Sequence, residues 1–150
     1  MIRFISGLLA VVTMSAVLAT SAMAQDHTRN WDNGNIVAVT EVHIEPGMFN
    51  AYINDLNNVW RKFLEEQMKD GSVVSYGMFG NTSARDGEPD LYLTVTYANW
   101  AAFDRGEAYW EGITNKVMGS VDQARSANVK RGELRKLGSE YMLQEIKFRD

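Results

Sequence analysis

The chain has 150 residues, with 15 Lys and Arg, 19 Asp and Glu, no cysteine and a formal net charge of −4 at pH 7. The lack of cysteine excludes disulfides, thiolate metal ligands, thiol nucleophiles, attached c-type haem and lipid anchors on cysteine. The acidic balance argues against non-specific binding to nucleic acid or to an anionic membrane surface.

Residues 1–24, MIRFISGLLAVVTMSAVLATSAMA, have the three parts of a secretory signal peptide. Arg3 supplies the basic start, an apolar run follows, and the closing AMA matches the small-residue rule for cleavage. We therefore expect a mature chain of about 126 residues that begins at Gln25, the size of one domain. The short signal and the missing disulfides favour a bacterial periplasmic or secreted protein, with no membrane segment once the signal is removed.

The mature chain opens with a polar stretch, residues 25–35, whose Asn-Gly turn signal predicts a flexible lead-in. Residues 36–44 are rich in β-branched side chains and predict a strand. The pair Pro46-Gly47 follows directly, and it is typical of a place where a strand stops and a helix begins.

A long helix is predicted over residues 48–69, because apolar residues recur there every three or four positions and polar ones occupy the other side. Asp-Gly at 70–71 supplies the helix stop. Two further strands are predicted over 72–80 and 90–98, and the polar segment between them, 81–89, predicts a long hairpin connection.

The last third of the chain predicts helices followed by a strand. Asn99 can cap a helix that Gly106 and Gly112 interrupt, so two helical pieces are expected. Residues 121–138 predict a charged helix on the surface or against a partner, and residues 140–148 predict the final strand.

The resulting order, β-α-β-β-α-β, predicts an α+β domain over residues 36–150 with a ferredoxin-like antiparallel sheet and an extra C-terminal helix. Strand alternation places two sets of first-strand side chains on opposite faces. The apolar set, which suits the helices, is Ile36, Ala38, Thr40, Val42 and Ile44. The mixed set is Val37, Val39, Glu41, His43 and Glu45. In the strand over 90–98 the apolar set is Leu91, Leu93, Val95 and Tyr97, and the mixed set is Tyr92, Thr94 and Thr96. Such a mixed face suits a dimer interface that encloses a cavity.

The runs HIEPGMFNAYINDLNNVW, GSVVSYGMFG and DLYLTVTYANWAAFD, with the closing strand, resemble the dimeric α+β barrel superfamily, which includes antibiotic-biosynthesis-monooxygenase-like domains. The strand-Pro-Gly-helix opening and the strand-Asn-Trp-helix junction carry the resemblance, which spans residues 36–148. It implies a homodimer whose two sheets face each other as a barrel. It also implies a small, partly apolar ligand between sheet and helices.

Known members of the superfamily include cofactor-free oxygenases, haem-degrading enzymes, polyketide cyclases and aldoxime dehydratases, and many have no known activity. The haem-degrading members pair an asparagine on the first strand with a tryptophan and a histidine on the second helix. Here Thr40 or Glu41 stands at the strand position, and the second helix has Trp100 and Trp110 but no histidine. We therefore expect no cofactor.

His43 is the candidate catalytic base. Cyclases of the superfamily use a histidine with a tyrosine, and His43 with Tyr76 or Tyr92 could repeat that pair. The ordinary pKa of histidine, about 6.5, suits proton transfer near neutral pH, and the adjacent Glu41 could orient the ring. The structural alternative places His43 half in solvent at the end of its strand, paired with a glutamate.

The candidate ligand-binding residues are Glu41, Tyr76, Tyr92, Thr94 and Trp110. No metal site is predicted, because Glu41, His43 and Glu45 are spaced about 7 Å apart along one strand, too far to share an ion. Most other aromatic residues have the helical spacing of core residues.

Three functions remain open at this stage. The first is an exported small-molecule-binding domain of the dimeric α+β barrel type with no recognisable catalytic set. The second is a cofactor-independent monooxygenase or cyclase with His43 as its base. The third is a non-catalytic module that binds a partner through the segment 121–138. The sequence does not decide whether the protein is an enzyme.

Overall fold

The computed structural model describes residues 29–149, so the predicted signal peptide lies outside the described part. No helix of this part is both long enough and apolar enough to cross a membrane. The elements, in chain order, are β1 (Trp31–Ile44), α1 (Phe49–Asp55), the π-helical segment η1 (Leu56–Trp60), α2 (Arg61–Met68), β2 (Val73–Gly80), β3 (Leu91–Tyr97), the 3₁₀ helix η2 (Trp100–Phe103), α3 (Glu107–Met118), α4 (Val121–Arg131) and β4 (Arg135–Phe148).

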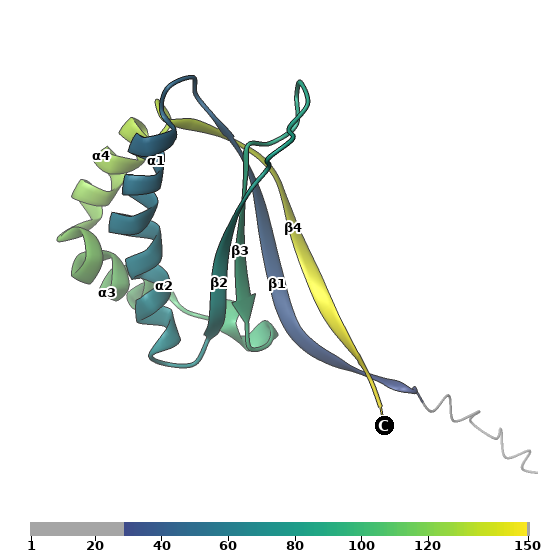
Figure 1. The fold of residues 1–150 in the computed structure, drawn as a ribbon. Helices are drawn as coiled ribbons and strands as arrows, with labels where there is room; N and C mark the ends of the chain where they lie inside the picture. Colours follow the sequence, from purple (N-terminus) through teal and green to yellow (C-terminus); the bar gives the residue numbers. More distant parts are fainter. Residues whose placement is uncertain (1–28, 150) are drawn as a thin grey trace, which may run out of the picture.

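The four strands form one antiparallel sheet in the order β2-β3-β1-β4. The four labelled helices lie together on one side of this sheet, which we call the helix-facing side (Figure 1). No helix of residues 29–149 lies over the opposite side, which we call the outer face. The predicted α+β, ferredoxin-like arrangement is confirmed, since the strand order and the one-sided helix layer are those of a split βαβ unit.

The core lies between the helix-facing side and the first helical segment. One cluster joins Tyr52 and Leu56 of that segment to strand residues, and a second cluster surrounds Leu64. Trp60 packs against both clusters. The buried strand residues are Ile36, Ala38, Val42, Val73, Leu91, Leu93 and Val95. The predicted alternation of β1 and β3 is therefore confirmed, because the apolar set of each strand is the buried one.

The junction between β1 and α1 has the predicted form. Gly47 adopts a φ of 79°, a left-handed conformation that glycine tolerates without steric cost. At the second junction, the Asn99 side chain accepts a hydrogen bond of 2.9 Å from the Ala101 N–H, which is the expected cap. Both junctions that carried the sequence resemblance thus form as local turns and caps.

The predicted lead-in over residues 25–35 is wrong for its last five residues, because β1 begins at Trp31. Trp31 pairs with Phe148 at the far end of β4, and Nε of Arg149 donates to Asp32 at 2.9 Å. These contacts join residues more than a hundred positions apart, so a local pattern does not reveal them. The ends of β1 and β4 form an arm that projects beyond the other strands (Figure 1).

The predicted helix 121–138 is also too long, because α4 ends at Arg131 and β4 begins at Arg135 rather than at residue 140. Arg135 is already paired with Ile44 of β1, and strand pairing overrides the weak helical pattern. Gly106 lies at the predicted break between η2 and α3. Gly112 lies inside α3 and does not interrupt it.

The first helical segment runs from Phe49 to Met68, close to the predicted 48–69, but it is not a uniform α-helix. Its middle part, Leu56–Trp60, is π-helical. A π segment widens the helix by one residue and rotates the side chains that follow it. This places Trp60 between the two core clusters.

Candidate functional site

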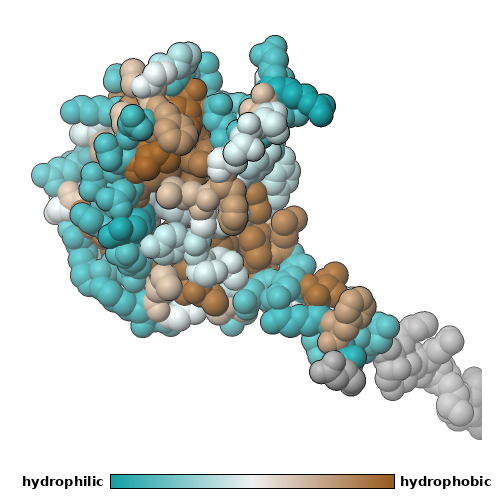
Figure 2. All heavy atoms as spheres, viewed as in Figure 1, coloured by the Kyte–Doolittle hydropathy of each residue, from teal (hydrophilic) through white to brown (hydrophobic). Residues whose placement is uncertain are grey.

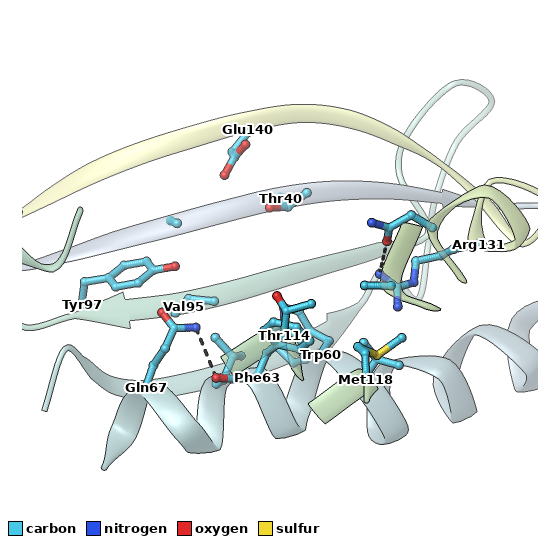
Figure 3. A pocket seen from close by; sticks show the side chains of 15 residues that line it. Thr40, Trp60, Phe63, Gln67, Val95, Tyr97, Thr114, Met118, Arg131 and Glu140 are labelled. Atoms are coloured by element: carbon cyan, nitrogen blue, oxygen red, sulfur yellow. Dashed lines mark hydrogen bonds between the residues drawn. The ribbon is translucent and has the colours of Figure 1, made fainter. Parts of the chain in front are cut away.

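A cavity of about 450 Å³ lies between the helix layer and the helix-facing side of the sheet. Its walls come from β1, β3 and β4 on one side and from η1, α2, α3 and α4 on the other (Figure 3). Figure 2 shows hydrophobic side chains gathered where the helices meet the sheet. The volume is within the usual range of small-molecule sites, about 300 to 1,000 Å³.

Three aromatic side chains, Trp60, Phe63 and Tyr97, form much of the apolar lining. The Trp60 ring meets Tyr76 edge-on at a centroid distance of 5.4 Å, and the Tyr97 ring lies 4.6 Å from that of Phe103. Neighbouring rings on both sides therefore hold the cavity aromatics in place. Short π-helical segments are frequent at functional sites. The segment η1 ends at Trp60, which lines the cavity.

Polar groups enter the same cavity from both layers (Figure 3). Glu140 on β4 and Thr40 on β1 are cross-strand partners, so both side chains point to the helix-facing side. Gln67 comes from α2 and Thr114 from α3. Gln67 is only 6% exposed, and its side-chain amide donates to the Phe63 carbonyl at 3.3 Å.

Arg131, at the end of α4, is held by a two-pronged ion pair with Asp55. Its Nε and Nη2 atoms donate to the two carboxylate oxygens at 2.6 and 3.3 Å, and Nη1 donates to Asn128 at 3.2 Å. Both side chains of the ion pair are mostly buried, at 17% and 20% exposure. The guanidinium charge is therefore compensated within the protein.

The Tyr97 hydroxyl remains protonated at neutral pH. Burial raises the pKa of Tyr97 above its usual value, and the negative charge of Glu140 raises it further. The Tyr97 hydroxyl on β3 can therefore donate a hydrogen bond in the cavity. It lies close enough to Glu140 on β4 for that carboxylate to affect its pKa.

The sequence-predicted site residues divide between the outer face, the helix-facing side and α3. Glu41 and Tyr92 are cross-strand partners on the outer face. His43 and Thr94 lie on the same face, because each is two residues along the strand from one of these partners. Tyr76 pairs with Val95 and lies on the helix-facing side, so it cannot share a site with His43. Trp110 lies on α3, 38% exposed and edge-on to Tyr109. None of the six predicted residues lines the 450 Å³ cavity.

Glu41 has a defined structural role. Its carboxylate accepts a hydrogen bond of 2.6 Å from the Tyr141 hydroxyl and one of 3.1 Å from the Ser139 N–H. The register between β1 and β4 shifts between Thr40 and Val42. The Ser139 N–H therefore donates to a side chain, the Glu41 carboxylate. Position 138, next to Ser139, requires a glycine, since an added Cβ would lie 2.9 Å from Glu41 Cβ and 3.1 Å from His43 Nε2.

His43 therefore lacks the orienting carboxylate that the sequence suggested. Its cross-strand partner is Lys136, whose Nζ lies 3.4 Å from a carboxylate oxygen of Glu45. Within residues 29–149, no group of three or more His, Asp or Glu side chains is arranged to hold a metal ion.

Replacing Tyr141 by phenylalanine is expected to raise the pKa of Glu41 toward its usual range. That pKa is lowered chiefly by the Tyr141 hydrogen bond, then by the Ser139 amide, with a smaller contribution from His43. A lowered carboxylate pKa contributes stability above the unfolded-state value and loses it as pH falls through the folded-state value. The variant should therefore lose less stability on acidification. Carbon-13 NMR titration of the Glu41 carboxyl group measures the pKa.

His43→Gln is the matched control for that titration, because its charge is the smallest of the named causes. It should shift the Glu41 pKa less than Tyr141→Phe does. An unchanged Glu41 pKa in Tyr141→Phe would contradict the structural role that we assign to this hydrogen bond.

The polar cavity residues that sequence reasoning missed include Thr40, Gln67, Tyr97, Thr114, Arg131 and Glu140. One signal was available, because Thr40 is the single polar member of the apolar β1 set. Its neighbour across the sheet, Glu140, could not be identified without the pairing of β1 with β4.

Comparison with known proteins shows no matching family model and no matching curated protein. Among solved structures, a dimeric ferredoxin-like protein from an uncultured marine organism is 16% identical, with a TM-score of 0.47 over 75% of this chain and 96% of that chain. A second dimeric ferredoxin-like protein, also from an uncultured marine organism, is 7% identical, with a TM-score of 0.48 over 79% and 91%. SnoaB, a cofactor-independent oxygenase from Streptomyces nogalater, is 12% identical, with a TM-score of 0.36 over 75% and 91%.

At such identities the likeness concerns the fold alone, and activity does not follow from a shared fold. The strand order β2-β3-β1-β4 and the helix layer on one side are properties of this chain itself. By this architecture, the protein has an α+β, ferredoxin-like fold.

Proposed function

We propose that the protein is an exported, homodimeric binding protein for a small, partly apolar molecule, held in the cavity between the helices and the sheet. The single observation that carries this proposal is the combination of aromatic walls with available polar groups. Among the lining residues drawn in Figure 3, hydrogen bonds join only Gln67 to Phe63 and Arg131 to Asn128. In the described part of the chain the hydroxyls of Thr40, Thr114 and Tyr97 form no hydrogen bond, so they can orient a ligand whose apolar body contacts the rings.

The exposed outer face supports the homodimer. Phe79, Tyr141 and Leu143 are 60%, 41% and 53% exposed in the single chain, and they share that face with Val37 and Val39. When a second sheet covers the apolar side chains on this face, they are removed from water, which stabilises the dimer. The signal-like residues 1–24 support an exported location.

The two alternatives have less support. A cofactor-independent monooxygenase or cyclase with His43 as base would act on the outer face, where Glu41 is already engaged by Tyr141 and Ser139. A partner-binding module would use the segment 121–138, which is divided between α4 and the start of β4. One side of α4 also lines the cavity.

Filling the cavity tests the proposal. Ala124 lines it from α4, so Ala124→Phe should place a ring inside and weaken binding of the neutral probe 2-(1-naphthyl)ethanol by about tenfold or more. Isothermal titration calorimetry measures the affinity. Ala108→Phe on the exposed side of α3 is the matched control and should leave it unchanged.

Circular dichroism and thermal unfolding of both variants check that the fold is retained. Two results would contradict the proposed function. The first is a wild-type protein that binds none of the naphthyl compounds described below. The second is a folded Ala124→Phe variant that binds as tightly as the wild type.

A further inference from the structure

We propose that the ligand of this cavity is an organic cation, an amine with an apolar body, and that Glu140 receives its ammonium group. The inference rests on the proposed function, because it names the ligand class of the same cavity. Three observations carry it: the charge balance of the lining, the position of Glu140 and the aromatic walls.

The described lining residues include one cationic side chain, Arg131, and one anionic side chain, Glu140. Arg131 is already paired, since the Asp55 carboxylate accepts from two of its five N–H donors and Asn128 accepts from a third. An anionic ligand would compete with Asp55 for this guanidinium, and weakening a mostly buried ion pair costs free energy. The lining therefore disfavours anions.

Glu140, in contrast, forms no ion pair within residues 29–149. Its side chain extends from β4 toward the space between strands and helices (Figure 3). Its charge also acts on Tyr97, since it contributes to the raised pKa of that hydroxyl. The carboxylate thus places an unpaired negative charge at a cavity whose one cation among the described lining residues, Arg131, is already paired with Asp55.

The rings of Trp60, Phe63 and Tyr97 line the same cavity. Aromatic faces attract cations through their quadrupole, and tryptophan does so most strongly. They also cover the apolar part of an amine. A protonated amine that is attached to an aromatic or aliphatic body therefore matches both the carboxylate and the rings.

Three compounds with one skeleton separate charge from shape: 2-(1-naphthyl)ethylamine, 2-(1-naphthyl)ethanol and 1-naphthylacetate. Calorimetry at pH 7 and low salt should show the amine binding about five to ten times more tightly than the alcohol, and the carboxylate binding weakest. The factor is modest because Glu140 is exposed to solvent at the mouth. It should shrink as salt is added, since salt screens exposed charges.

Glu140→Gln keeps the shape and the hydrogen-bonding capacity of the side chain and removes its charge. In this variant the amine should bind no more tightly than the alcohol, while the affinity for the alcohol stays within about twofold of the wild type. Glu133→Gln, an exposed carboxylate outside the cavity lining, is the matched control and should retain the amine preference.

The possible outcomes distinguish the two proposals. If wild-type protein binds the alcohol as tightly as the amine, or if the preference survives Glu140→Gln, the cation inference is overturned and the binding function stands. If none of the three compounds binds, the binding function is overturned, and the inference that depends on it is overturned as well.

Discussion

Val39→Asp is expected to convert the proposed homodimer into monomers. Val39 lies centrally on the outer face, opposite Thr94 on one side and Tyr141 on the other. In a dimer that joins two outer faces, the substitution places one unpaired carboxylate from each subunit in a water-poor interface. The cost of desolvating an unpaired charge amounts to several kcal/mol. Two such charges should weaken association by about a thousandfold or more, about 4 kcal/mol.

Analytical ultracentrifugation over a concentration series measures this change. Val129→Asp is the matched control, because Val129 is 76% exposed on α4, which lies on the opposite side of the sheet. It adds the same charge and should leave the dimer intact. A wild-type protein that is monomeric at micromolar concentration would contradict the homodimer, as would a Val39→Asp variant that remains dimeric.

Leu91→Ala is expected to lower the free energy of unfolding by about 3 kcal/mol, the middle of the range for leucine truncation in a core. Leu91 is 3% exposed and pairs across the sheet with Val42, which is fully buried. Both contact Tyr52 and Leu56 in the main cluster. Removal of the leucine side chain leaves a void that the sheet and the helix cannot both close, because each is held by other contacts.

Urea denaturation at one fixed protein concentration measures the loss, since the stability of a dimer depends on concentration. Val129→Ala is the surface control and should change stability by no more than about 0.5 kcal/mol. A Leu91→Ala variant as stable as this control would show that the cluster around Tyr52 does not hold the helices to the sheet.

Local sequence patterns predicted the features that depend on local physics. The alternation in β1 and β3 identified their buried sides, because successive strand residues point in opposite directions wherever the strand is placed. Gly47 and Asn99 marked turns that a few neighbouring residues determine. The element order then restricted the topology to a ferredoxin-like sheet, and the structure has that sheet.

Strand ends and helix interiors were predicted less well. Trp31 and Arg135 belong to strands because β1 and β4 pair along their whole length, and neither segment shows a strand pattern alone. The π segment that ends at Trp60 has no recognised local signal. Tyr76 was a possible partner of His43, but it lies on the helix-facing side, because β2 shifts register between Val73 and Ser75 and its pairing with β3 decides the face.

The sequence alone determined the class of fold, the sidedness of the central strands and the absence of cysteine chemistry, since composition and short-range periodicity are sufficient for these. Only the tertiary structure decided which polar residues form a site. In the folded chain Glu41 accepts a hydrogen bond from Tyr141, and Thr40, Tyr97 and Glu140, which come from three strands, line one cavity. The physical reason is that a site depends on contacts between distant segments, and these exist only after the strands have paired and the helices have packed.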